Sequence, residues 1–372
     1  MKLTIERSAL LASLQHVQSV VERRNTIPIL SNVELSAEGA ELRLTATDMD
    51  IWVYDQTPAD VGASGSITAS AHMLFDIVRK LSDDSKVELE LGKVEGQLSL
   101  KSGQTLFSLS SLPVEDFPSV SEGDWGCKFQ MPAAAICELI DRARFAMSTE
   151  ETRYYLNGIF LHPTTGPKDH ALRAVATDGH RLARADVDLP KGTDGMPSVI
   201  VPRKAVTELR KILESVEGVV TVSLSDTKAR FATDSVILTT KLIDGTFPDY
   251  QRVIPDDNRK VLRVARQVFS EAVDRVSTVS KDKTRAIKLS LKKNNLLLTA
   301  HTPDQGSASE ELAVEYDADD LEIGFNARYL LEMTEQIRGD HISFKMEDGA
   351  SPAVVEDEKD PRTIYVLMPM RV

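Results

Sequence analysis

The sequence predicts an α+β protein in which one unit, two helices on an antiparallel sheet, is repeated three times. The clearest sign is a strand of alternating apolar residues that ends in a polar corner. It reads LRLTATDMDIWV at Leu42–Val53, LRAVATDGHRLAR at Leu172–Arg184 and, more diverged, LLLTAHTPDQG at Leu296–Gly306. Alternation of this kind is typical of a half-buried strand, and Thr, Asp and Gly favour a tight turn. Three such segments along one chain indicate an internal repeat, with corners at Asp48, Asp178 and Asp304.

Each copy of this pattern lies between two stretches with the apolar spacing of a helix. Residues at i, i+3, i+4 and i+7 form one apolar stripe, which predicts a helix that packs on a sheet. Strand patterns such as KVELEL, VVTVSL and HISFKM follow the second helix of each pair, which favours antiparallel sheet. The six predicted helices are Glu6–Arg24, Ser70–Leu81, Pro132–Met147, Pro202–Glu214, Arg263–Arg285 and Asn326–Arg338.

The predicted connections between repeats are polar and rich in Pro, Gly and Asp. They lie near Glu122–Trp125 and Pro255–Asn258. We therefore expect three domains, 1–124, 125–256 and 257–372, each of a size that can hold its own core.

Composition excludes several classes of protein. No run approaches the ~18 consecutive apolar residues of a membrane span. The start, MKLTIERSALL, carries charges where a signal peptide would be apolar. The two cysteines, Cys127 and Cys137, lack the spacing of a metal or redox site. We expect a cytoplasmic protein without a membrane segment, a metal or a cofactor.

The distribution of charge leaves two interpretations open. The net charge of −13 argues against a nucleic-acid partner. The six predicted helices together carry a net positive charge, however, so the rest of the chain is strongly acidic. A basic face lined by helices suits phosphates, and an acidic exterior suppresses non-specific binding. The alternative is that the charged helix faces are simply solvated.

The sequence predicts no catalytic residues. It has neither a Gly-rich phosphate loop nor an HExxH motif, and its seven histidines are scattered. The TDGHR segment brings together Asp178, His180 and Arg181, which could indicate acid–base chemistry. With no nucleophile in a motif, the same residues are also typical of a tight turn.

The C-terminal segment Tyr365–Val372 is apolar where chain ends are usually polar. It is compatible with a last strand in a core. Its two methionines around a proline also suit an adaptable apolar groove, and one strand can serve both purposes.

Six motifs in order along the chain carry a resemblance to a known family. They are TIPIL (Thr26–Leu30), RYYLNG (Arg153–Gly158), ATDGHRLA (Ala176–Ala183), VIVPRKAV (Val199–Val206), FPDY (Phe247–Tyr250) and YVLMPMR (Tyr365–Arg371). The chain resembles the bacterial DNA polymerase III beta subunits, the sliding clamps. The resemblance implies a DNA clamp fold and a ring-shaped homodimer that encircles duplex DNA without reading bases. It also implies a non-catalytic processivity factor that tethers polymerases to the template.

Helix dimensions favour two chains in such a ring. Six helices, each ~10 Å across, would leave roughly 9 Å of clear diameter, too little for a duplex. Twelve helices would leave roughly 28 Å, enough for a duplex and a water layer.

The resemblance also implies site residues and partners. The partners are the polymerase III alpha subunit, the clamp loader, other polymerases and repair proteins, all of which would use short peptides. The peptide groove is expected at Leu156, Thr177, Gly179, His180, Arg181, Leu182, Pro248, Arg252, Val253, Pro352, Val366, Met368, Pro369, Met370 and Arg371, with the arginines as a polar rim.

Double-stranded DNA is expected at Arg24, Arg79, Tyr154, Arg203 and Lys204, and the dimer seam at Phe107, Leu109, Thr278 and Val279. At the seam, Thr278 and Val279 stand where bulkier apolar residues are usual in the family. Two further departures lie near the expected DNA contacts. Glu150 stands where Gln is common, and His72 where Arg is common. Two competing hypotheses are a scaffold that binds peptides but never DNA, and a nucleotide enzyme that uses Asp178 and His180.

Overall fold

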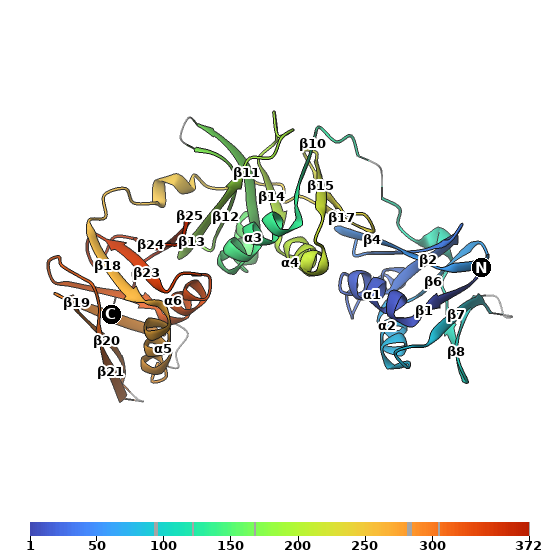
Figure 1. Ribbon diagram of the computed structural model, residues 1–372, viewed down its shortest axis with the longest axis horizontal. Coiled ribbons are helices and arrows are strands. Elements are labelled where there is room, and N and C mark those ends of the chain that lie inside the picture. Colours follow the sequence, from blue (N-terminus) through green and yellow to red (C-terminus); the bar gives the residue numbers. More distant parts are fainter. Residues whose placement is uncertain (93–95, 121–122, 167–168, 281–284, 304–305, 372) are drawn as a thin grey trace. The chain divides into compact units, whose positions relative to one another are not determined.

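The computed structural model describes residues 1–92, 96–120, 123–166, 169–280, 285–303 and 306–371. These residues form two compact units (Figure 1). Unit 1 comprises 1–137, 190–197 and 204–242; unit 2 comprises 138–189, 198–203 and 243–372. No helix in the described ranges is both long enough and apolar enough to cross a membrane. The division into three domains, 1–124, 125–256 and 257–372, stays a prediction.

Unit 1 contains two antiparallel sheets. The five-stranded sheet has the order β5 (Asp60–Ala63), β1 (Lys2–Glu6), β7 (Lys86–Leu91), β8 (Gln97–Ser102) and β9 (Thr105–Ser110). The eight-stranded sheet has the order β10 (Cys127–Pro132), β15 (Val219–Leu224), β16 (Lys228–Ala232), β17 (Val236–Lys241), β4 (Ile51–Pro58), β3 (Glu41–Thr47), β2 (Asn32–Glu38) and β6 (Gly65–Ser70). Helices α1 (Arg7–Gln18) and α2 (Ala71–Lys80) lie side by side (Figure 1).

Unit 2 also contains two antiparallel sheets. The eight-stranded sheet has the order β14 (Val199–Pro202), β11 (Gly158–Gly166), β12 (Asp169–Thr177), β13 (Arg181–Asp188), β25 (Asp360–Leu367), β24 (Ala353–Asp357), β23 (His341–Met346) and β18 (Lys260–Ala265). The four-stranded sheet has the order β21 (Gly306–Ala313), β20 (Asn295–Thr302), β19 (Ala286–Lys292) and β22 (Leu321–Asn326). Helices α5 (Arg266–Ser277) and α6 (Ala327–Thr334) contact each other.

The predicted six α-helices are confirmed among the described residues, but every one starts later and ends earlier than the sequence suggested: they end at Gln18, Lys80, Ala143, Ile212, Ser277 and Thr334. Each begins directly after a strand: α1 after β1, α2 after β6, α3 (Ala133–Ala143) after β10, α4 (Arg203–Ile212) after β14, α5 after β18 and α6 after β22. Glu6, Ser70 and Asn326, taken as helical, have extended backbones instead. Apolar spacing cannot separate the last residues of a strand from the first turn of a helix, because boundaries depend on backbone angles.

The two eight-stranded sheets are assembled in the same way. In each, two four-stranded halves meet where the strand after a Thr–Asp corner pairs with a closing strand. β4 pairs with β17, with Val53 opposite Leu238, and β13 pairs with β25, with Leu182 opposite Val366. Because antiparallel pairing joins the backbones directly, each junction continues one hydrogen-bonded sheet. β9 and β21 are outer strands of the two smaller sheets.

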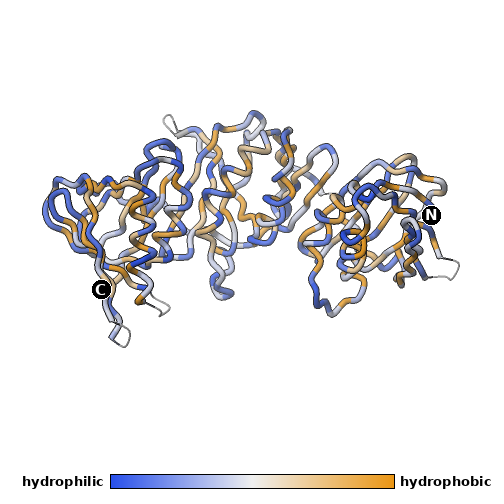
Figure 2. Tube along the Cα trace, turned by 60° about the horizontal axis from the view of Figure 1, so that its bottom comes forward, coloured by the Kyte–Doolittle hydropathy of each residue, from blue (hydrophilic) through white to orange (hydrophobic). Residues whose placement is uncertain are grey.

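The cores follow the predicted alternation. Along the strands, hydrophobic and hydrophilic residues alternate in Figure 2. The stripe of α1 buries Leu10, Leu14 and Val17, and in unit 2 Phe269 of α5 packs on Phe344 with ring centroids 5.3 Å apart. Each such side chain contributes about 1.5–3 kcal/mol of transfer free energy when it is fully buried.

The corner between β12 and β13 is held by short-range hydrogen bonds. The Asp178 carboxylate accepts the backbone N–H groups of His180 at 2.9 Å and Arg181 at 3.0 Å. The Thr177 hydroxyl accepts the N–H of Gly179 at 3.0 Å and donates to the carbonyl of Arg181 at 2.7 Å. Gly179 has φ = +88°, a conformation that costs least for glycine.

The first corner has closely similar bonds. Asp48 accepts the N–H groups of Asp50 at 3.0 Å and Ile51 at 2.7 Å, and Thr47 accepts that of Met49 at 2.9 Å. Met49 has φ = +78°, so the positive φ found at Gly179 is repeated at the equivalent position of this corner. The repeat predicted from sequence is therefore confirmed at these two corners, whereas the third, at Asp304, lies outside the described residues.

We expect Gly179→Ala to lower the melting temperature more than Gly195→Ala. Both glycines have positive φ, so both substitutions impose backbone strain of about 1 kcal/mol or more. A Cβ on Gly179 would also lie 2.5 Å from Nη1 of Arg153, whereas one on Gly195 meets nothing within 4 Å. Thermal denaturation of the two variants measures the difference. Equal shifts would show that the Arg153 contact has no cost.

Candidate functional site: an apolar groove in unit 2

Unit 2 contains a cavity of about 260 Å³ with mainly apolar walls, which we call the apolar groove. Four segments contribute to it: the 153–156 turn, the 177–182 corner, the 248–253 loop, and the end of β25 with Met368 just beyond it. A concave apolar surface with a few polar groups has the anatomy of a ligand or peptide site. The lining residues are Arg153, Tyr155, Leu156, Thr177, Gly179, Arg181, Leu182, Pro248, Asp249, Tyr250, Val253, Val366 and Met368.

Sheet pairing brings two of these segments together. Leu182 of β13 lies opposite Val366 of β25, and just beyond the strand the N–H of Met368 donates to the carbonyl of His180 at 2.9 Å. Leu156, Leu182 and Val366 also belong to one buried apolar cluster. Its members are Leu156, Val175, Leu182, Ile200, Phe247, Tyr250 and Val366. The floor of the groove is therefore the core of the protein, so its position is fixed by packing.

The third segment is fixed by a polar network beneath Tyr250. Its hydroxyl accepts a hydrogen bond from Nη1 of Arg173 at 3.3 Å and lies 3.0 Å from Nε2 of His162. Arg173 is buried and pairs with both carboxylate oxygens of Asp186 at 2.7 Å. A bidentate pair of this kind fixes the orientation of the guanidinium, so the Tyr250 ring has an anchored position in the wall.

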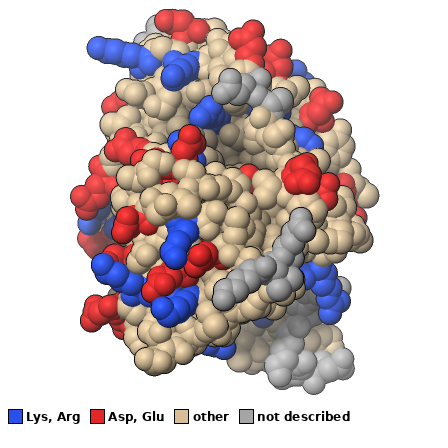
Figure 3. Space-filling view, turned by 90° about the vertical axis from the view of Figure 1, so that its right-hand side faces the viewer, with Lys and Arg blue, Asp and Glu red and all other residues tan. Residues whose placement is uncertain are grey.

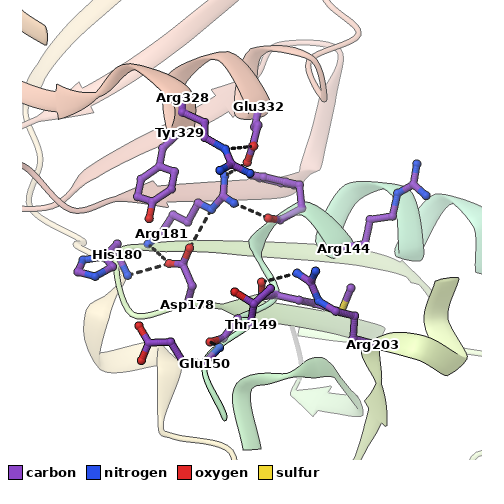
Figure 4. Close-up of a pocket in the computed structure, with 13 residues that line it drawn as sticks. Arg144, Thr149, Glu150, Asp178, His180, Arg181, Arg203, Arg328, Tyr329 and Glu332 are labelled. Carbon is purple, nitrogen blue, oxygen red and sulfur yellow. Dashed lines mark hydrogen bonds and ion pairs between the residues drawn. The ribbon is translucent and has the colours of Figure 1, made fainter. Parts of the chain in front are cut away.

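Arg181, expected in the polar rim, lines the groove but is buried. Its guanidinium pairs with Asp178 at 3.1 Å and with Glu332, and it donates to the carbonyl of Phe145 at 2.6 Å (Figure 4). The cation also lies 4.4 Å from the ring centroid of Tyr329. Burial acts to raise the pKa of Glu332, but hydrogen bonds from Arg328 and Arg181 bring it below its ordinary value. Arg181 thus stabilises the fold behind the groove.

A second, polar pocket of about 400 Å³ lies on the other side of Arg181 (Figure 4). His180 stacks on Tyr329 there, with ring centroids 6.4 Å apart. Asp178 is occupied by backbone N–H groups and by Arg181, so it does not form the acid–base pair with His180 that one hypothesis required. No group of His, Cys, Asp and Glu residues in the described ranges could hold a metal.

The predicted peptide-binding residues divide into three groups. Nine line the apolar groove: Leu156, Thr177, Gly179, Arg181, Leu182, Pro248, Val253, Val366 and Met368. His180 lines the polar pocket, and Arg252 is exposed and pairs with Asp249 at 2.8 Å. The structure does not place Pro352, Pro369, Met370 and Arg371 among the lining residues.

Sequence reasoning missed four lining residues: Arg153, Tyr155, Asp249 and Tyr250. All four lie inside motifs that were recognised, RYYLNG and FPDY. These four residues could have been found from their position, because each lies beside a predicted groove residue in the same motif.

The predicted DNA-binding residues differ in their exposure and in whether their charges are paired within the protein. Arg24 is exposed, and Tyr154 is 53% exposed. Arg79 is exposed but pairs with Asp76 at 3.0 Å. Arg203 donates to the carbonyl of Met147 at 2.8 Å; burial, with the nearby Arg181 cation, lowers its pKa.

Lys204 is held by carboxylates of its own unit. Its ammonium pairs with Asp48 at the first corner and with Glu22 at 3.4 Å. Burial acts to lower its pKa, but hydrogen bonds to these carboxylates raise it overall. His72, which stands where Arg is common in the family, has its hydrogen-bonding partners within the fold. Its ring nitrogens lie 3.1 Å from Oε1 of Gln18 and 2.8 Å from the carbonyl of Val21.

The predicted seam residues lie at sheet and helix ends. Phe107 of β9 is half-buried and Leu109 is buried, so both point toward the core face of their sheet. Thr278 is exposed and Val279 half-buried, just after α5. The structure adds Leu106, which is 67% exposed on the same outer strand and which the sequence analysis did not select.

Comparison with known proteins agrees with this geometry. Family models of the DNA polymerase III beta subunit match its N-terminal domain at residues 1–121, its central domain at 130–249 and its C-terminal domain at 251–371. The beta sliding clamps of Caulobacter vibrioides and Pseudomonas aeruginosa are 49% and 40% identical, each over the full length of both chains.

Solved structures agree as well. The sliding clamp of Bartonella birtlesii bound to griselimycin is 50% identical with a TM-score of 0.97, and that of Pseudomonas aeruginosa bound to griselimycin is 40% identical with a TM-score of 0.95. Both comparisons cover the whole of each chain. The chain therefore belongs to the DNA polymerase III beta subunit family, the non-catalytic beta sliding clamps.

Proposed function

We propose that this protein is the processivity factor of the replicative polymerase and that the apolar groove is where its partners bind. The groove carries this proposal, because its floor is a fixed apolar core and its walls come from four separate segments. Such a pocket binds a short segment through a few bulky anchors. The polymerase III alpha subunit, the clamp loader, other polymerases and repair proteins would compete for it through peptides that carry a Gln and two or three apolar residues.

We expect Met368→Ala to weaken binding of such a peptide by about 1–2 kcal/mol, the scale of a truncated anchor contact. Met368 lines the groove, so the substitution removes part of one wall. The measurement is a fluorescence titration of a labelled peptide. The control is Met73→Ala, which truncates a methionine that is 54% exposed on α2 of unit 1. If both variants bound like the wild type, Met368 would not belong to the site.

The sheet junctions favour a head-to-tail homodimer. Within one chain the strand after a corner pairs with a closing strand twice, β4 with β17 and β13 with β25. The same rule would pair β21, which follows the third corner, with β9, which closes the first repeat. Both are outer strands of their sheets. Outer strands offer unpaired backbone groups, so a second copy can supply the missing partner.

Side chains near these strands support the same contact. Leu106 and Phe107 on β9 present apolar surface, and Thr278 and Val279 follow the helix α5 that packs on β21. Figure 3 shows a face with a broad middle in which Lys, Arg, Asp and Glu are sparse, bordered by charged groups of both signs. Depletion of charge is typical of interface cores. With twelve helices, a ring of two chains would enclose a duplex.

We expect Leu106→Ala combined with Phe107→Ala to shift the protein from dimer to monomer. The loss of two apolar contacts should cost a few kcal/mol of association free energy. Sedimentation velocity at micromolar concentration measures the shift, with Leu91→Ala on the inner strand β7 as the control. A monomeric wild type would contradict the dimer itself.

Contacts with DNA would be made to phosphates only, in keeping with a ring that slides. Arg24 is exposed, and no ion pair joins it to another residue in the described ranges. Lys204, by contrast, is already paired with Asp48 and Glu22. Free cations release more counterions on binding DNA than cations that are already paired. The replication role fits a cytoplasmic location.

We expect Arg24→Gln to reduce retention on circular duplex DNA more than Lys204→Gln does, by several-fold at low salt, at every sequence alike. The assay compares retention of loaded protein on circular and linear duplexes at two salt concentrations. Equal retention on circular and linear DNA by the wild type would favour the peptide-binding scaffold instead. A loss limited to some sequences would indicate base reading.

A further inference from the structure

Glu150 and Arg153 form a bidentate ion pair at the mouth of the apolar groove. Nε of Arg153 donates to Oε2 of Glu150 at 2.9 Å, and Nη2 lies 2.8 Å from Oε1. The backbone supports this pair, because the N–H of Arg153 also donates to the carbonyl of Glu150 at 3.3 Å. Arg153 interrupts the turn around it with φ = −111° and ψ = 48°.

The pair connects the apolar groove with the polar pocket. Arg153 lines the apolar groove, whereas Glu150 lines the polar pocket (Figure 4). The guanidinium reaches from Glu150 across Gly179, where a Cβ would lie only 2.5 Å from Nη1. A residue with a side chain at position 179 would displace it, so glycine allows this placement. Arg153 is thus a wall of the groove whose orientation Glu150 fixes.

Three of the described arginines in or beside the groove pair with carboxylates of the same unit. Arg181 pairs with Asp178 and Glu332, and Arg252 pairs with Asp249. Arg153 pairs with Glu150, and hydrogen bonds from Arg153 lower the pKa of that carboxyl. Both partners are partly exposed, with side-chain exposures of 32% for Arg153 and 54% for Glu150. The pair is therefore within reach of a bound peptide.

We infer that Glu150 determines specificity in this groove. By occupying the bidentate face of Arg153, it leaves no unpaired cation among the described residues that line the groove, Arg181 being paired as well. The protein would then prefer partner segments with neutral polar residues beside their apolar anchors. This inference rests on the proposed peptide-binding function. It also gives Glu150 a role other than contact with DNA, where its charge would repel phosphate.

The test compares two fluorescein-labelled decapeptides, each with one Gln and two Leu anchors, that differ only in Asn or Asp between the anchors. Titrations are made with wild type, Glu150→Gln, Glu151→Gln and the double variant Glu150→Gln/Arg153→Met. Glu150→Gln frees Arg153. The affinity for the Asp peptide should therefore rise roughly three- to five-fold relative to that for the Asn peptide, the scale of an exposed ion pair. High salt should abolish that gain.

The controls separate a specific pair from general charge. Glu151 is an exposed neighbour, and its substitution by Gln removes the same charge from the protein. It should leave the Asp-to-Asn ratio unchanged, and the double variant should lose the gain. If Glu150→Gln changed the affinity for both peptides by the same factor, or for neither, the inference would be overturned. The proposal that the groove binds peptides would be unaffected. Failure of both peptides to bind the wild type would overturn the proposed function itself and this inference with it.

Discussion

The pairing of β13 with β25 is the interaction on which the groove depends. It places Leu182 opposite Val366 and so joins two chain segments that are far apart in sequence. A shift of one residue in this register would turn Leu182 and Val366 to the opposite face of the sheet. The register is specified because those side chains fill a buried cluster with Leu156, Phe247 and Tyr250. The same residues therefore pack the core and form the floor of the binding surface.

Ion pairs then decide how much of the basic surface is available. Lys204 and Arg181 are cations that sequence reasoning placed on binding surfaces, yet each is held by carboxylates of its own unit. The acidic balance of the chain, −13, makes such matching common. A cation that is already paired gains less from a phosphate or an acidic peptide than a free one. Arg24, which is exposed, is different in this respect.

The sequence predicted much of the fold and part of the site. Alternation and helical spacing identified the six helices, and the Thr–Asp corners at 47–48 and 177–178 have the same hydrogen bonds. Helix starts were wrong because each follows a strand without a break, and apolar spacing does not mark that change. The burial of Arg181 could not be predicted, since its partner Glu332 is distant in sequence. Tyr250 was missed for a similar reason: Arg173 and His162, which anchor it, belong to other strands.

The central claim is that four segments, separate in sequence, form one peptide-binding groove, and hydrogen–deuterium exchange tests it most directly. Amide exchange of the full-length protein would be followed with and without a saturating peptide that carries a Gln and two Leu anchors. The account predicts slower exchange at 153–156 and 177–182, at 250–253 and at 366–368 together, because these segments line one cavity. Protection confined to one of these segments, or located at β9 or β21 instead, would contradict it.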